Sequence, residues 1–102
     1  MAEVRVIAKF VARKGKEKQL RELLRGMLAP THAEAGCKTY DLYESDSKGR
    51  FYFYESWESQ AALDRHAASP HFKGLEQSGA ELFQEPFEVN ILEEIQVAAA
   101  AS

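Results

Sequence analysis

The segment from Arg50 to Leu75 holds most of the side chains in this 102-residue chain that could carry chemistry. Glu55 and Trp57 stand two residues apart in a strand-like run, so their side chains would lie on one face. His66 and His71 follow in the same segment. An imidazole is matched to proton removal near neutral pH, an indole can stack on a planar ring, and a carboxylate on an apolar face can act as a base. Together these side chains suit removal of a phenolic proton from an aromatic compound.

The catalytic candidates are Trp57, Glu55 and His66, and each also has a structural interpretation. Trp57 could be a core anchor instead of a substrate contact. Glu55 needs a partner or a raised pKa if its face is buried, and pairing with Arg65 or His66 is the interpretation that we favour. His66 lies near the end of a short predicted helix, where a histidine can also offset the helix dipole.

Four further residues are candidates for the lining of a substrate pocket. Phe53 shares the predicted strand face of the glutamate and the tryptophan and would hold a substrate ring. His71 and Phe72 lie in the first turn of the helix that Pro70 opens. His32 falls in an irregular segment and is expected at the surface or at the rim of the pocket. The histidines show neither His-x-His nor His-x-x-x-His spacing, so the sequence predicts no metal site.

The first part of the chain predicts a strand, a helix and a further helical turn. Residues 3–12 alternate with a period of two, which marks a strand. From Lys16 the apolar residues follow the spacing of an amphipathic helix: Leu20, Leu23, Leu24, Met27 and Leu28. Pro30 removes a helical hydrogen bond, so we expect a kink or a break near Ala29. The further turn ends at Gly36, which provides a left-handed stop.

The candidate residues belong to the next part, which predicts a hairpin and two helical segments. Residues 37–44 and 50–57 have strand patterns joined by a polar turn. Ser59 can cap a short helix. Ser69 can cap a second helix with Pro70 at its first position, where the missing N–H costs nothing.

The C-terminal part predicts one more strand and a tail. Residues 86–95 form the strand, with one apolar face made of Phe87, Val89, Ile91 and Ile95. Residues 97–102 are rich in alanine and are expected to be frayed. The sequence therefore predicts one domain over residues 1–96 and a disordered tail over residues 97–102.

The order of these elements is β-α-β-β-α-β, which predicts an α+β, ferredoxin-like fold with an antiparallel sheet and both helical segments on one face. The other face of the sheet would then be open. It would expose Ile7, Val11 and either Tyr52 with Tyr54 or Phe51 with Phe53. An apolar patch of this size usually marks an interface, so we expect a homodimer formed through the sheet.

The composition restricts the classes of partner. A net charge of -3 gives no basic surface for nucleic acid, and no apolar run is long enough for a membrane span. Cys37 is the single cysteine, which leaves no intramolecular disulfide and no cysteine metal cluster. The N-terminus lacks the layout of a signal peptide, so we expect a cytoplasmic protein.

The run FYFYESWESQAALDRHAASPHFKGL, with its His-x-x-Ser-Pro-His-Phe motif from His66, resembles the antibiotic biosynthesis monooxygenase family. The EAGC segment from Glu34 to Cys37, followed by Tyr40, is similar to the family's entry into its second strand, and the resemblance extends from Val4 to about Ile95. The resemblance implies a dimeric ferredoxin-like fold. It also implies oxidation of a quinol or another small aromatic compound with O2, without flavin, haem or metal, in a pocket between sheet and helices.

Other branches of the family use residues that this chain lacks. The haem-degrading branch has an Asn, a Trp and a His at positions that hold Ala8, His66 and Glu76 here. The polyketide-tailoring branch has an Asn four residues before the strand tryptophan, where this chain has Phe53 before Trp57. Neither mechanism can therefore be transferred whole.

The sequence thus predicts a homodimeric, cofactor-independent monooxygenase with His66 as the base and with Trp57 and Phe53 holding the substrate ring. Two alternatives remain open. A third relative, which isomerises or degrades a phosphorylated sugar signal, shares the Arg50–Glu55 pattern and the histidine motif, so His66 and His71 could provide acid–base chemistry instead. A non-catalytic module that binds a small ligand is the other, because folds of this kind host many functions.

Overall fold

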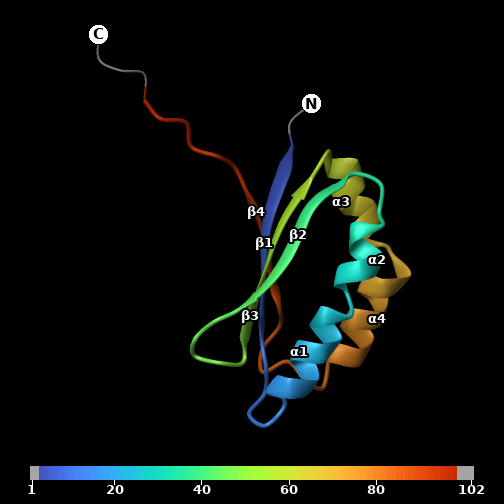
Figure 1. Ribbon diagram of the computed structural model, residues 1–102, viewed down its shortest axis with the longest axis vertical. Coiled ribbons are helices and arrows are strands. Elements are labelled where there is room, and N and C mark those ends of the chain that lie inside the picture. The colour runs from blue at the N-terminus through green and yellow to red at the C-terminus, as the bar shows by residue number, and fades with distance from the viewer. Residues whose placement is uncertain (1–2, 99–102) are drawn as a thin grey trace.

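Alternating apolar and polar residues build a sheet, and segments with helical spacing cover one of its faces (Figure 1). The computed structural model describes residues 3–98. Its elements are β1 (Val4–Val11), α1 (Glu17–Arg25), α2 (Leu28–His32), β2 (Cys37–Glu44), β3 (Arg50–Trp57), α3 (Gln60–Ala67), α4 (Pro70–Gly79) and β4 (Glu88–Leu92). The strands pair antiparallel in the order β2-β3-β1-β4. The predicted α+β, ferredoxin-like arrangement is confirmed.

The core lies between the helices and the covered face of the sheet. Val6 of β1 pairs with Glu55 of β3, and Ala8 pairs with Phe53, so alternate side chains of both strands point toward the helices. The helices contribute Leu20, Leu24, Ala62, Leu63 and Leu75. Trp57 lies at the end of the same covered face and is fully buried.

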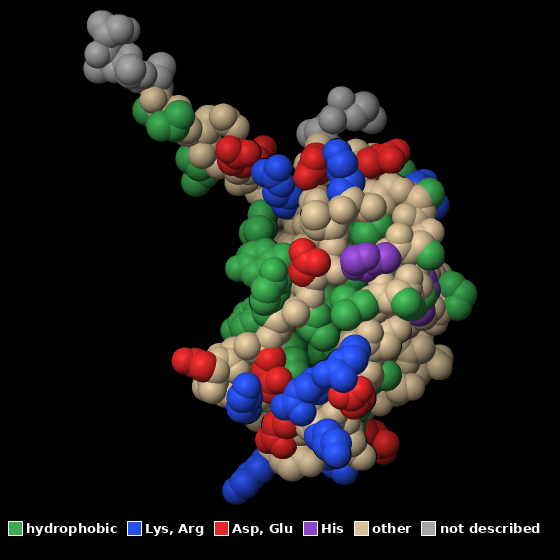
Figure 2. Space-filling model, viewed as in Figure 1, with side chains coloured by type: hydrophobic (Ala, Val, Ile, Leu, Met, Phe, Trp, Pro, Cys, Tyr) green, Lys and Arg blue, Asp and Glu red, His purple; other side chains and the backbone are tan. Residues whose placement is uncertain are grey.

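The opposite face of the sheet carries tyrosines and has no described element packed over it (Figure 1). Of the two predicted pairs, Tyr52 and Tyr54 lie on this face, because they pair across the sheet with Lys9 and Ile7. Tyr54 is 51% exposed, and its ring meets that of Tyr43 edge to face at 5.6 Å. Figure 2 shows hydrophobic side chains along the sheet between charged groups at its two ends.

Val11 differs from the prediction, since it is buried rather than exposed on the open face. The chain that follows α4 folds back against this end of β1. Gln84 donates its backbone N–H to the carbonyl of Val11 at 2.8 Å, and Ala12 pairs with Phe83 in an isolated bridge.

The predicted break near Ala29 is also displaced. Helix α1 ends at Arg25, with Gly26 as its C-cap, and a new helix, α2, begins at Leu28. Pro30 is the third residue of α2, where a backbone N–H would have no partner within the helix, so the proline does not need to break it. None of the described helices is long and apolar enough to span a bilayer.

The last strand is shorter than predicted, and most of its apolar face is exposed. Phe87 stacks on Phe10 at 5.0 Å and belongs to the core, whereas Val89 and Ile91 of β4 are exposed. Ile95 lies beyond the strand and is 93% exposed. Val89 and Ile91 are on the covered side of the sheet, but the helices do not reach this edge, so both side chains stay exposed. Of the predicted tail, residues 97 and 98 have no regular structure, and residues 99–102 lie outside the described part of the chain.

Candidate functional site

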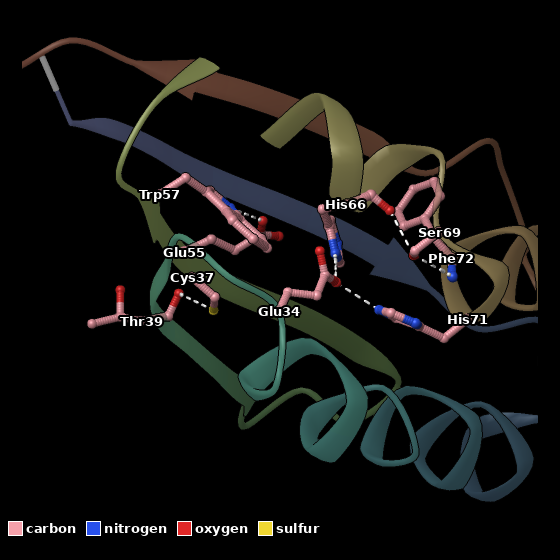
Figure 3. A network of polar contacts seen from close by, with 9 residues as sticks. All are labelled: Glu34, Cys37, Thr39, Glu55, Trp57, His66, Ser69, His71 and Phe72. Atoms are coloured by element: carbon pink, nitrogen blue, oxygen red, sulfur yellow. Dashed lines mark hydrogen bonds and ion pairs between the residues drawn. The ribbon is translucent and has the colours of Figure 1, made fainter. Parts of the chain in front are cut away.

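The side chains that could carry chemistry converge where α3 and α4 meet the sheet (Figure 3). β3 supplies Glu55 and Trp57, α3 supplies His66, and α4 supplies His71. The turn between α2 and β2 supplies Glu34, which the sequence did not identify as a candidate for chemistry. The EAGC segment was the available signal, but it was recognised only as part of the family resemblance.

Glu34 joins the two histidines through one carboxylate oxygen. Its Oε2 lies 2.7 Å from Nδ1 of His66 and 2.6 Å from Nε2 of His71. Because an ionised carboxylate can only accept, each imidazole donates an N–H to it. The bond to Nδ1 leaves Nε2 of His66 without a hydrogen-bond partner among residues 3–98. This is the orientation that a histidine base requires.

The turn that carries Glu34 is fixed in place by Gly36. Gly36 has the predicted left-handed backbone, with φ of +88°, although α2 already ends at His32. A Cβ added at Gly36 would lie 2.7 Å from Cβ of Ala62 in α3. The absence of a side chain therefore allows this turn to approach α3 closely. That approach brings the carboxylate to His66.

Ser69 fixes the two histidines relative to each other. Its hydroxyl donates to the carbonyl of His66 at 2.7 Å and accepts from the backbone N–H of Phe72 at 3.2 Å. It is thus the N-cap of α4, with Pro70 at the first position, as predicted. The His-x-x-Ser-Pro-His motif therefore positions both imidazoles.

Glu55 pairs with Trp57 rather than with the predicted Arg65 or His66. The indole Nε1–H donates to Oε1 of Glu55 at 3.0 Å, and both side chains are buried. Burial raises the pKa of Glu55 to about 7, and the bond from Trp57 opposes part of that rise. The position of both residues on one strand face, two apart, was a signal for this pairing.

Aromatic rings surround His66 on three sides. Its ring centroid lies 4.7 Å from Trp57, 5.4 Å from Tyr40 and 5.3 Å from Phe72. Burial lowers the pKa of His66, although its bond to Glu34 opposes the change, so the neutral ring is favoured. Tyr40 also stacks on Phe53 at 4.4 Å. Burial also raises the pKa of Tyr40, which keeps its hydroxyl protonated.

A groove of about 510 Å³ lies beside this cluster, between α2 and the edge strand β2. Its lining consists of Leu28, Ala29, His32, Tyr40, Asp41, Leu42 and Tyr43. His32 belongs to α2 rather than to the expected irregular segment, and its Nε2 donates to the carbonyl of Tyr40 at 2.7 Å. Tyr40 is shared by the groove and the buried cluster, since it lines the groove and its ring lies 5.4 Å from that of His66.

Cys37 has no reactive character. Burial raises the pKa of its thiol to about 11, so the thiolate is scarce at neutral pH. Its Sγ–H points to the carbonyl of Thr39 at 3.8 Å.

Comparison with known proteins finds relatives that are similar to this chain in sequence and in fold. Residues 3–77 match the sequence model of the family described as "Antibiotic biosynthesis monooxygenase". The Mycobacterium tuberculosis protein named "Putative monooxygenase Rv0793" is 41% identical over 97 residues, which cover 95% of this chain and 96% of that protein. The solved structure of Rv0793 has a TM-score of 0.87 over 96% of this chain and 100% of that one. The structure of PA3566 from Pseudomonas aeruginosa also has a TM-score of 0.87, at 32% identity, over 94% of this chain and 97% of that one.

Proposed function

The chain belongs to the antibiotic biosynthesis monooxygenase family, and from that premise we propose that it oxidises a quinol or another small aromatic compound with O2, without a cofactor. The family and the names of its relatives indicate a monooxygenase. One observation carries the finer proposal. His66 is a buried, neutral imidazole whose Nδ1–H is bound to Glu34 and whose Nε2 is available to take a proton.

In the proposed first step, Nε2 of His66 removes the proton of a phenolic hydroxyl. Glu34 holds the ring orientation and stabilises the imidazolium that forms, because its carboxylate is 2.7 Å from Nδ1. The resulting aromatic anion is rich in electrons and can pass one electron to O2. The two radicals then combine at a ring carbon that bears hydrogen, which gives a peroxide anion. The imidazolium of His66 returns its proton to that peroxide, and loss of water leaves a quinone that carries one oxygen atom of O2.

The substrate would enter by the groove between α2 and β2. The groove offers apolar walls, and His32, the expected rim residue, is among the residues that line it. To reach His66 the substrate would displace the ring of Tyr40, which lies 5.4 Å from the His66 ring and belongs to a residue that lines the groove. Displacement would leave the substrate against Phe53 and Trp57, in a site from which water is excluded.

We also propose that the active form is a homodimer joined through the open face of the sheet. That face presents Ile7, Tyr43, Tyr52, Tyr54 and Leu92 together. A second copy would cover this patch, including Leu92 of β4. The helices already occupy the other face, so association there is not required.

The test is oxygen uptake by chelator-treated protein over a panel of hydroquinones and naphthols, with boiled protein as the control for autoxidation. Uptake that saturates with substrate and yields one quinone per O2 supports the proposal. Uptake equal to that of the boiled control overturns it. Anaerobic conversion of a phosphorylated carbonyl compound would favour the isomerase, whereas thermal stabilisation by a ligand without turnover would favour the binding module.

A further inference from the structure

We propose that Glu34, His66 and His71 form a binding site for a divalent transition-metal ion, of which Zn²⁺ fits best. Oε2 of Glu34, Nδ1 of His66 and Nε2 of His71 all lie within 4.8 Å of one another. Two imidazoles and one carboxylate are the protein ligands of many catalytic zinc sites. The site does not depend on the monooxygenase proposal, since it rests on ligand geometry alone.

The three ligand residues belong to separate elements whose relative positions are fixed. Gly36 fixes the turn of Glu34 against α3, and Ser69 links the end of α3 to the start of α4 (Figure 3). Ligand atoms around a tetrahedral zinc ion, each at about 2.0–2.1 Å from it, are about 3.3 Å apart. The two nitrogen–oxygen distances here are 2.7 and 2.6 Å, so a small outward movement would admit the ion.

Binding of the ion requires a rearrangement of two protons. Each imidazole now donates an N–H to Glu34, and the same nitrogen would become the metal ligand. Each ring can remain neutral if its proton moves to the other nitrogen, which is Nε2 in His66 and Nδ1 in His71. The proton-sharing arrangement and the metal-bound arrangement therefore exclude each other.

Access and ion preference follow from burial and ligand chemistry. His66 is buried, but the side chains of Glu34 and His71 are 15% and 21% exposed, so an ion and its remaining water ligands can approach from their side. Mg²⁺ and Ca²⁺ prefer six or more oxygen ligands, and this site offers one carboxylate. Zn²⁺ and Co²⁺ should therefore bind, while Mg²⁺ should not.

The closing experiment titrates chelator-treated protein with Zn²⁺ by calorimetry and with Co²⁺ by visible absorption. We expect one site per chain, a tetrahedral Co²⁺ spectrum, and at least a tenfold loss of affinity in Glu34→Gln and in His71→Ala. His32→Ala, which removes a histidine outside the cluster, should bind Zn²⁺ as the unaltered protein does. Circular dichroism and the melting temperature of each variant show that it is folded, and Glu34→Gln is the milder of the two changes.

Absence of saturable Zn²⁺ binding would overturn the proposal, and so would equal affinity in Glu34→Gln, His71→Ala and the unaltered protein. Loss of binding in His32→Ala would place the ion elsewhere and would also overturn it. Oxygen uptake is measured separately on metal-free protein, so the monooxygenase proposal can fail while the metal-binding proposal holds, and the reverse. If both hold, Zn²⁺ should inhibit uptake, because Nε2 of His66 would carry a proton and could not act as the base.

Discussion

Tyrosines on the two faces of one sheet occupy opposite environments. Tyr40 on the covered face is buried, stacks on Phe53 and lies 5.4 Å from the ring of His66. Tyr54 on the open face is half exposed and touches another tyrosine. Because side chains alternate between the two faces of a strand, tyrosines on one face pack against the buried polar cluster and tyrosines on the other lie at the surface. The difference suggests that chemistry belongs to the covered face and association to the open face.

The largest expected effect is on the covered face. His66→Ala should lower kcat for oxygen uptake about 10²–10⁴-fold, because the proposed base is lost. In the unaltered protein the acid limb of the pH–rate profile should lie below pH 6.5, since burial lowers the pKa of His66. Steady-state oxygen electrode measurements from pH 4.5 to 8 test both expectations.

The matched control for His66→Ala is Glu76→Ala, which alters an exposed residue of α4 at the position that holds a histidine in the haem-degrading branch. It should leave kcat and the pH profile unchanged. An unaltered kcat in a folded His66→Ala protein would assign the base to another residue. Glu55, with its pKa near 7, would then be the next candidate.

The second effect is a pH dependence of stability that comes from Glu55. Its pKa is raised from 4.5 to about 7 on folding, so the folded state binds this proton more tightly than the unfolded state does. This contribution is fully present below pH 4.5 and is lost as the pH rises to about 7. The loss is about 3 kcal/mol at most. His66 acts in the opposite sense, because its lowered pKa removes stability as the pH falls.

Glu55→Gln separates these two contributions. Urea unfolding between pH 4.5 and 8 should show that the unaltered protein loses stability relative to Glu55→Gln as the pH rises. The slope from His66 remains in both proteins and cancels in the difference. A difference that stays constant with pH would mean that Glu55 has an ordinary pKa and is less buried than its place on β3 indicates.

The third effect concerns the bond between Trp57 and Glu55. Trp57→Phe removes the indole donor and leaves a buried carboxyl group without a partner, which should cost about 1–3 kcal/mol of unfolding free energy. Part of that cost is the smaller ring. The same change in a Glu55→Met background removes only the packing, so it should cost less. Equal costs in the two backgrounds would show that the indole contributes packing alone.

The sequence was sufficient for elements whose determinants are local. The strands at residues 37–44 and 50–57 were predicted to the residue, because each has a period-two pattern bounded by turn residues. Ser69 and Pro70 likewise predicted the start of α4. The open face was predicted as one of two alternatives, since alternation alone does not say which side the helices cover.

The site needed the tertiary structure. Glu34 lies 32 residues before His66 and 37 before His71, and no local spacing signals that the three meet. The spacing test for metal ligands considered only histidines close together in the sequence, so it could not detect a group formed by separate elements. The exposure of Val89 and Ile91 in β4 could not be foreseen either, because local alternation does not show that the helices stop short of this edge of the sheet.

The smallest effect is expected on the open face. Tyr54→Arg places a charge in the proposed dimer interface and should weaken association at least tenfold, which is about 1.4 kcal/mol. The free energy of unfolding of the monomer should change by no more than about 0.5 kcal/mol, because the residue is already half exposed. Gln77→Arg adds the same charge on the exposed side of α4 and should leave the dimer intact. Light scattering over a dilution series measures the mass of each protein. If the unaltered protein is a monomer, or if Tyr54→Arg dimerises unchanged, the open face is not the surface of association. The proposed contrast between the two faces would then be wrong.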